Sequence, residues 1–265
     1  MPATLPAHAA AVLPFFRARR WMPPTALVVG ACAPDMAYAI RWAGWFSHSL
    51  AGVFLFCLPM GLIALVWLEA LVLPALRRTL PPACGVQWAR FLRTDGVPDS
   101  AGTLLRAAIG IVIGTLTHLL WDGFTHRSMW PAQVLYPHVV VPLPGGQLSL
   151  ARVLQHVSSI LGTAIVCAVM ARRYRHLPAA PGGSWSAFLP ILTPTLAGAA
   201  VGLSTRILHF RYLGALEAQL WWMFWPAFSC ACLGLTLGCV YAWIRGTGFG
   251  EAHAARHEPR LGSGR

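Results

Sequence analysis

Long apolar runs separated by short polar stretches divide the chain. Five runs, at residues 48–73, 102–124, 153–171, 188–208 and 221–243, are each close to the ~20 residues that a helix needs to cross a bilayer. A sixth run, residues 25–45, is apolar enough to cross but contains Pro34, Asp35 and Arg41. The pattern therefore predicts an all-α fold, a polytopic transmembrane helical bundle of about six spans.

The arginines between these runs favour six spans over five. Every one of the 20 basic residues is Arg. Six spans place 15 arginines on one side of the membrane and 5 on the other, whereas five spans give 12 and 8. Because positive residues concentrate in cytoplasmic loops, we expect both termini to be cytoplasmic and residues 125–152 to be extracytoplasmic. All-Arg usage is typical of a GC-rich bacterial genome, so the expected location is a bacterial cytoplasmic (inner) membrane.

Composition excludes several classes of protein. Hydrophobic residues make up 57% of the chain and charged residues 11%, whereas a soluble domain carries about a quarter charged residues. A soluble enzyme, a disordered chain and a coiled coil are thereby excluded. The net charge is +12, but the arginines lie in the gaps between apolar runs rather than on one polar face. The expected partner is therefore the lipid bilayer and not nucleic acid.

The N-terminal region permits a second interpretation. Arg17, Arg19 and Arg20 precede a short apolar run, and Ala31-Cys32-Ala33 follows it, as in a signal peptide or a lipoprotein cleavage site. The apolar run is short, and cleavage would remove arginines that fit the topology, so the six-span interpretation is preferred.

The predicted organisation is a membrane domain at residues 1–175, two further transmembrane helices at 176–245 and a mobile basic tail at 246–265.

The stretch richest in reactive side chains lies at the extracytoplasmic end of the third predicted span. His118, Asp122 and His126 recur every four residues, which places them on one face of a helix. This spacing allows an imidazole and a carboxylate to bind one divalent metal, or the carboxylate to orient the imidazole. An ionisable group at membrane depth costs several kcal/mol and normally faces a partner inside the protein. We therefore expect a functional site here.

Other polar residues are predicted at the same level of the membrane. His48 opens the second span from that side, and Asp35 follows Pro34, which frees backbone carbonyls that need partners. His8 falls on the opposite side and joins the others only if residues 5–16 insert as a re-entrant or amphipathic segment. For the span-end or loop residues His138, His156 and His209, an interfacial hydrogen-bonding role is the ordinary interpretation.

The third acidic candidate, Glu69, is expected away from this cluster. It lies near the cytoplasmic end of its span, where we expect it to snorkel to the interface or to pair with Arg77 or Arg78. The sequence contains no G-x-S-x-G motif, no P-loop and no G-x-G-x-x-G motif. Six of the seven cysteines lie in apolar runs, so neither a disulfide framework nor a zinc ribbon is expected. Metal-assisted chemistry is the enzymatic option that these motifs leave open.

An ordered series of motifs resembles an uncharacterised family of bacterial integral membrane proteins over roughly residues 1–175. The motifs are Met1 to His8, Gly30-Ala31-Cys32-Ala33-Pro34-Asp35, Ser47-His48-Ser49-Leu50, His118 to His126, and Leu154-Gln155-His156-Val157-Ser158-Ser159. A more distant similarity is to the membrane-bound metal-dependent hydrolases, whose pattern is an early His, Pro-Asp, a His heading a span, and His-x-x-x-Asp. That similarity implies metal-site roles for His8, Asp35, His48, His118 and Asp122. Met36-Ala37 stands where those hydrolases usually have a second Asp, which argues against a centre of two or three metals.

The leading hypothesis is a membrane-embedded metal-dependent hydrolase acting on a lipid-linked or phosphoester substrate. The substrate class rests on a looser analogy with zinc-dependent phospholipase C and nuclease folds. His8, His48, His118 and Asp122 are the predicted ligands of a divalent metal, expected to be Zn²⁺. Asp35 is a ligand or general base, and His126 transfers protons or supports the ligands. The alternative is a non-enzymatic assembly factor or small transporter in which the same residues form a hydrogen-bond network or proton relay.

Overall fold

The computed structural model describes residues 4–19, 21–40, 44–81, 95–143, 146–174, 183–207 and 216–245. Within these residues, five helices are long and apolar enough to cross a membrane: Leu50–Thr79, Ala101–Thr125, Leu150–Arg172, Trp185–Thr205 and Met223–Ile244. Each covers one of the five clear apolar runs. The strand content of the described residues is one short hairpin. The predicted all-α, polytopic helical bundle is therefore confirmed.

The expected sixth span is divided. Helix α2 (Pro24–Cys32) ends in a turn, and two short helices follow, α3 (Met36–Ala39) and α4 (Gly44–Ser47). The reason is Pro34, whose ring clashes with the carbonyl of the residue four positions earlier, Gly30. The Gly30 oxygen accepts instead from the backbone N–H of Ala33 and from the hydroxyl of Thr115, each at 3.1 Å. Residues 25–45 therefore do not form one continuous helix.

Glycines bring α2 against α9 (Ala101–Thr125). A Cβ atom added at Gly114 would lie 2.2 Å from the carbonyl oxygen of Leu27, and one added at Gly30 would lie 2.2 Å from that of Ile111. Small residues allow membrane helices to approach until their backbones touch. The close approach places the last turn of α2 directly beside the second half of α9.

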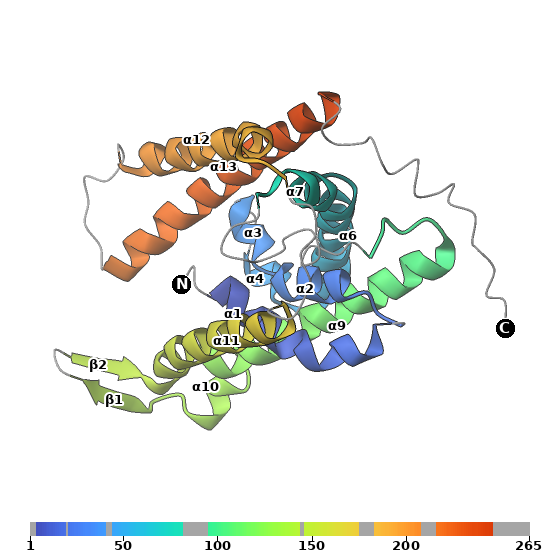
Figure 1. The fold of residues 1–265 in the computed structure, drawn as a ribbon. Coiled ribbons are helices and arrows are strands. Elements are labelled where there is room, and N and C mark those ends of the chain that lie inside the picture. The colour runs from blue at the N-terminus through green and yellow to red at the C-terminus, as the bar shows by residue number, and fades with distance from the viewer. Residues whose placement is uncertain are drawn as a thin grey trace.

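The N-terminal segment inserts between these helices. Helix α1 (Thr4–Val12) packs against α2, α9 and α11 (Leu150–Tyr174), and it continues as the 3-10 helix η1 (Leu13–Ala18). A Cβ atom added at Gly162 of α11 would lie 3.0 Å from the carbonyl oxygen of Ala7. Figure 1 shows α1 beside α11. One face of α1, with Ala7, His8 and Val12, is thus buried against the spans, and this contact brings His8 to the other candidates. Insertion of residues 5–16 into the membrane stays a prediction.

The first long span is irregular in two places. It consists of α5 (Leu50–Gly52), η2 (Val53–Cys57), α6 (Leu58–Trp67), η3 (Leu68–Val72) and α7 (Leu73–Thr79), and both η segments are π-helical. Each π-helical turn comes just before a proline, Pro59 or Pro74. Because proline lacks an N–H and crowds the preceding turn, the helix widens there rather than break. Ser49 caps the start, accepting from the backbone N–H of Gly52 at 3.0 Å.

The last two spans form an antiparallel pair. Helices α12 (Trp185–Ile207) and α13 (Leu216–Ile244) cross above α3 and α7 in Figure 1, on the opposite side from α9 and α11. Cβ atoms added at Gly202 and Gly234 would lie 2.2 Å and 1.9 Å from carbonyl oxygens of the facing helix. Trp67 donates a hydrogen bond to the hydroxyl of Thr236 at 3.0 Å and so joins the pair to α6. The predicted division at residues 175 and 245 stays a prediction, and the tail at 246–265 lies outside the described residues.

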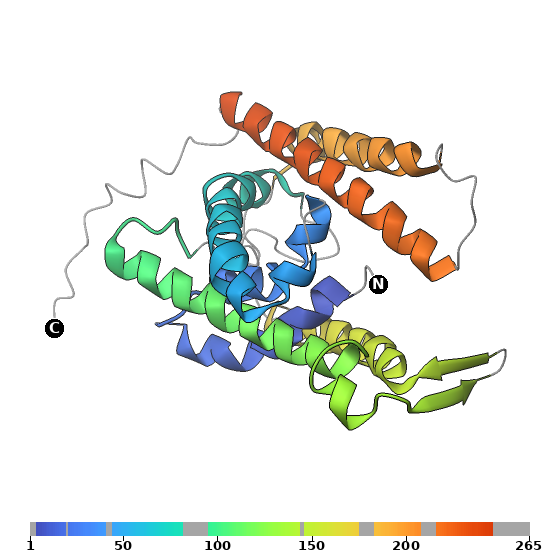
Figure 2. The ribbon, with the colours of Figure 1, turned by 180° about the vertical axis from the view of Figure 1, so that it is seen from behind.

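A compact polar segment connects α9 to α11. It contains α10 (Ala132–Leu135) and a hairpin of β1 (Val140–Leu143) and β2 (Gly146–Ser149), in which Val140 pairs with Ser149. Figure 2 shows the hairpin, in yellow-green, projecting beyond the ends of the two helices. This segment corresponds to the predicted loop at residues 125–152, whose extracytoplasmic location stays a prediction.

Candidate metal centre

Asp122, near the end of α9, is the centre of a buried His/Asp cluster. Its Oδ2 atom lies 3.3 Å from His118 Nε2 and 3.5 Å from His48 Nε2. Its Oδ1 atom lies 3.5 Å from His8 Nε2 and 3.4 Å from His126 Nδ1. All six residues named from the sequence meet here, because Asp35 Oδ1 lies 3.6 Å from His48 Nε2 and 3.9 Å from His118 Nε2. Their individual roles stay predictions.

The cluster is removed from solvent although it gathers residues far apart in the sequence. His8 is 1% exposed, His118 0%, Asp35 5% and Asp122 4%. They come from α1, α9 and the turn after α2, and His48 comes from the turn before α5. Because the groups lie together, each one lowers the desolvation cost of another. The same groups buried separately would each bear the full cost.

The backbone of α2 orients the ring of His118. Its Nδ1 atom lies 2.7 Å from the carbonyl oxygen of Ala31. A carbonyl only accepts, so Nδ1 carries the proton and a neutral ring has its lone pair on Nε2. That Nε2 atom is buried without a hydrogen-bond partner among the described residues. It faces the carboxylates of Asp35 and Asp122.

His48 is oriented in the same way from another element. Its Nδ1 atom lies 2.8 Å from the carbonyl oxygen of Gly44 in α4, so its Nε2 atom also points toward Asp35 and Asp122. Two imidazole Nε2 atoms, which carry lone pairs if the rings are neutral, and two carboxylates thus converge on one buried volume. Such an arrangement is unfavourable unless positive charge lies between them. A divalent cation or shared protons would supply it.

Ser47 holds the turn that carries Asp35. Its hydroxyl donates to the carbonyl oxygen of Pro34 at 2.9 Å, and the thiol of Cys57 donates to the carbonyl oxygen of Ser47 at 3.3 Å. The same carbonyl also accepts from the backbone N–H of Ala37 at 3.4 Å, so Ser47 adds a second and shorter bond to the turn. The interruption that prevents a continuous sixth helix therefore also aims Asp35 at the cluster.

Three of the four imidazole–carboxylate distances fit one metal ion, and the fourth, 3.9 Å between His118 Nε2 and Asp35 Oδ1, is longer. Zn²⁺ binds imidazole and carboxylate at about 2.0–2.2 Å, so tetrahedral ligand atoms lie roughly 3.3–3.6 Å apart. The distances from His48 Nε2 to Asp122 and Asp35 are 3.5 and 3.6 Å, and His118 Nε2 lies 3.3 Å from Asp122. Nδ1–H bonds to backbone carbonyls, as in His48 and His118, are typical of metal-binding histidines.

His8 stands in a different relation to the centre. Its ring stacks on that of His118 with centroids 3.8 Å apart, and His8, His118 and Asp122 form a second group with donor atoms close enough for a metal. The Nδ1 atom of His8, however, is buried without a hydrogen-bond partner among the described residues. Unlike His48 and His118, His8 therefore has no backbone carbonyl in the described part of the chain that fixes which ring nitrogen carries the proton.

A chain of hydrogen bonds leads from the cluster toward the surface. Gln155 of α11, which is 4% exposed, accepts from Arg152 Nη1 at 3.2 Å through Oε1. Its Nε2 therefore donates to His126 Nε2 at 3.0 Å, and His126 Nδ1 faces Asp122. Gln155 belongs to one of the sequence motifs but was given no role, because an amide at a span end does not by itself indicate a function.

Three other histidines were expected to have interfacial roles. Of these, His138 is exposed, His156 is half-buried on α11, and His209 lies outside the described residues.

Glu69 does not have the partners expected from the sequence. Its side chain is 3% exposed and accepts from the hydroxyl of Thr25 at 2.7 Å. It also accepts from the backbone N–H groups of Asp95 and Gly96 at 3.2 and 3.1 Å. The expectation that it pairs with Arg77 or Arg78 was wrong, because the segment before α9 folds back over this end of the span and supplies backbone donors.

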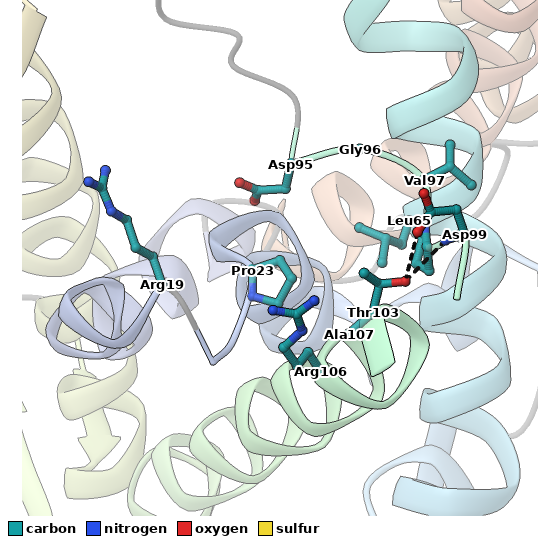
Figure 3. A pocket seen from close by; sticks show the side chains of 11 residues that line it. Arg19, Pro23, Leu65, Asp95, Gly96, Val97, Asp99, Thr103, Arg106 and Ala107 are labelled. Atoms are coloured by element: carbon teal, nitrogen blue, oxygen red, sulfur yellow. Dashed lines mark hydrogen bonds between the residues drawn. The ribbon is translucent and has the colours of Figure 1, made fainter. Parts of the chain in front are cut away.

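The segment held by Glu69 also lines a pocket of about 450 Å³. Figure 3 shows this pocket among the end of η1, the start of α2 and the first turns of α9. Arg19 and Arg106 line it together with Asp95 and Asp99. Because these charges balance and Asp99 accepts from Thr103 in the cap of α9, the pocket favours neither an anion nor a cation.

Comparison with known proteins places the chain in a family. A family model described as a domain of unknown function (DUF4184) matches residues 1–244. The chain belongs to this family. The match extends beyond residues 1–175, over which the motif series was recognised, and includes α12 and α13. No curated protein matches the chain, and no solved structure matches it.

Proposed function

We propose that this DUF4184 protein is a metal-dependent hydrolase of a bacterial cytoplasmic membrane, acting on a lipid-linked or phosphoester substrate at the extracytoplasmic face. The observation that carries the proposal is the orientation of two rings: backbone carbonyls hold Nδ1 of His48 and His118, so Nε2 of each is directed at Asp35 and Asp122. Protonated rings would place a donor opposite each carboxylate, whereas neutral rings leave acceptors that a divalent cation can bind. The proposal takes the second state, because an Nδ1–H bond to a backbone carbonyl is typical of metal-binding histidines.

The distances support three ligands and one base. His48, His118 and Asp122 Oδ2 are joined by distances of 3.5 and 3.3 Å, whereas Asp35 lies 3.6 and 3.9 Å from the two imidazoles. Catalytic zinc sites typically use three protein ligands and keep a fourth position open. Asp35, the more distant carboxylate, is left for the role of general base.

A divalent metal, expected to be Zn²⁺, supplies a Lewis acid that polarises the scissile group and lowers the pKa of a water molecule. Asp35 accepts the proton of the attacking water. The water oxygen forms the new bond to the scissile atom as the bond to the leaving oxygen breaks. The proton that Asp35 accepted then passes to the leaving oxygen, which balances the step. His126, whose Nδ1 faces Asp122 Oδ1, supports that carboxylate. His8 orients Asp122 through Oδ1.

Metal content of the purified full chain tests the proposal. Without chelators during purification, wild type should retain about one equivalent of a transition metal. Asp122→Asn should fall below about a tenth of that, since a neutral amide is a poorer ligand than a carboxylate. Asp99→Asn, at the other end of α9, is the matched control and should keep the wild-type content. Phosphoester hydrolysis should be lost with the metal.

The opposite result would support the alternative of a non-enzymatic membrane protein. If wild type is metal-free and does not take up added Zn²⁺, Mn²⁺ or Fe²⁺, the hydrolase proposal is wrong. The cluster would then hold protons and act as an inter-helix network or proton relay in an assembly factor or small transporter. Thermal unfolding of Asp122→Asn separates a lost ligand from a lost fold, and His48→Gln provides a second variant if the first does not fold.

A further inference from the structure

A pocket beside the cluster carries positive charge and no acid. It has a volume of about 350 Å³ and lies where α9, the β-hairpin and α11 meet. Arg127 and Arg152 line it together with His126, Gln147 and Ser149, and none of its lining residues is Asp or Glu. The pocket at the other end of α9 has two acids against its two arginines. Of these two pockets, only the one beside His126 therefore has a charge suited to an anion.

The two arginines are held by neighbours that accept from them. Arg152, half-buried in the first turn of α11, donates to Gln155 at 3.2 Å. Arg127 donates through Nε to the carbonyl oxygen of Pro137 at 2.9 Å. Because a guanidinium is planar, one such bond fixes its direction. The positive end of the 25-residue helix α11 adds to the field at the same place.

His126 separates this pocket from the metal centre. The ring lines the pocket, and its Nδ1 atom lies 3.4 Å from Asp122 Oδ1. Gln155 connects the same ring to Arg152. A group bound between the arginines would therefore lie one imidazole ring away from a carboxylate of the cluster. That is the spacing of a headgroup-recognition site next to a reaction centre.

The segment that carries Arg127 also presents apolar side chains outward. Trp130 is 72% exposed, Val134 67% and Leu135 62%. Exposed aromatic and aliphatic side chains at the end of a span are typical of the membrane interface. At that depth the anions available are the phosphates of lipid headgroups and of soluble phosphoesters near the surface.

We propose that the pocket lined by Arg127 and Arg152 binds a phosphate group of the substrate and thereby sets the substrate class. This assignment rests on the proposed hydrolase function for its catalytic meaning, but the binding itself does not require the metal. Arginine recognises phosphate through paired N–H···O bonds, and two arginines in a pocket lined by no carboxylate provide such bonds.

Equilibrium dialysis of labelled inorganic phosphate against the purified full chain tests the assignment. Wild type should bind phosphate, and Arg152→Gln or Arg127→Gln should each weaken binding about tenfold or more, the loss expected for one charge-assisted bond. Arg106→Gln removes the same charge in the opposite pocket and should stay within about twofold of wild type. Asp122→Asn should still bind phosphate. Metal content and thermal unfolding of each variant report whether it is folded.

Two competitors identify the source of the phosphate. Glycerol phosphate tests a soluble ester, and nanodiscs of phosphatidylcholine with and without phosphatidic acid test a lipid headgroup. Competition by either one supports the site, and the pattern shows which source it accepts. Two results would overturn the phosphate site and leave the hydrolase proposal standing. One is equal phosphate binding by wild type and both pocket variants. The other is a wild type that retains its metal but binds no phosphate. Phosphate binding by a metal-free wild type would support the site and overturn the hydrolase.

Discussion

The α2–α9 pair and the α12–α13 pair are both packed through glycines but differ in their ionisable side chains. In both, glycines let a helix approach until a Cβ atom would lie about 2 Å from a facing carbonyl oxygen, as at Gly114 and Gly202. The close approach of α2 brings the Ala31 carbonyl to 2.7 Å from His118. The described side chains of Trp185–Thr205 and Met223–Ile244 include no Asp, Glu or His.

This difference separates general membrane packing from a site. Glycine contacts of this kind recur wherever two helices must touch in lipid, so they indicate an interface and nothing about chemistry. Buried ionisable groups are costly in the same environment and persist where they have a function. The α2–α9 interface is therefore informative because its close contact orients an imidazole toward two carboxylates.

Matched glycine substitutions should give the largest difference between the two helix pairs. Gly114→Leu and Gly202→Leu each force a side chain into a facing backbone and should cost at least about 1–3 kcal/mol of stability. Only Gly114→Leu moves Ala31 away from His118, so it should also reduce metal content by more than about tenfold. Metal analysis and thermal unfolding of both variants measure this. Equal metal content in the folded fractions would show that the α2 contact does not orient the ligand.

Substitution of the buried carboxylates of Asp35 and Glu69 should affect metal binding and stability differently. Asp35→Asn should weaken metal binding by about 10–100-fold, because a carboxylate facing the metal is lost. Glu69→Gln should leave metal binding unchanged and cost about 1–3 kcal/mol of stability, since its partners are the hydroxyl of Thr25 in the first turn of α2 and the backbone N–H groups of Asp95 and Gly96 before α9. Titration with Zn²⁺ and chemical unfolding distinguish the two effects. A drop in metal affinity in Glu69→Gln would contradict the assignment of one centre.

The smallest effect should come from single hydroxyl groups. Ser47→Ala removes the hydrogen bond to Pro34 and should cost about 1 kcal/mol, together with a several-fold loss of metal affinity because Asp35 is aimed less well. Ser229→Ala removes a comparable bond, 2.7 Å to the Ala39 carbonyl, and should cost similar stability without affecting metal. An unchanged metal affinity in Ser47→Ala would mean that the turn keeps its shape without the hydroxyl.

Much of the site follows from local patterns. The spacing of His118 and Asp122 places them on one helix face, and the cost of burying charges in an apolar run predicts that they meet partners. Gln155 was not assigned because its role depends on α11 lying against His126. The partners of Glu69 were predicted wrongly because charge proximity along one helix gave no information about the segment before α9.

The sequence alone determined the five long spans, the all-α class and the identity of the polar candidates, because bilayer thickness and the cost of buried charge act on every short segment in the same way. Tertiary structure decided that α1 inserts and brings His8 to Asp122, and that residues 25–45 bend at Pro34 rather than cross as one helix. It also decided which imidazole nitrogen faces the carboxylates, through the carbonyls of Ala31 and Gly44. The contacts of His8 with Asp122 and of Ala31 with His118 join segments distant in sequence, so no local pattern encodes them. The break at Pro34 and the Gly44–His48 contact are local, but the residues that they face are set by the fold.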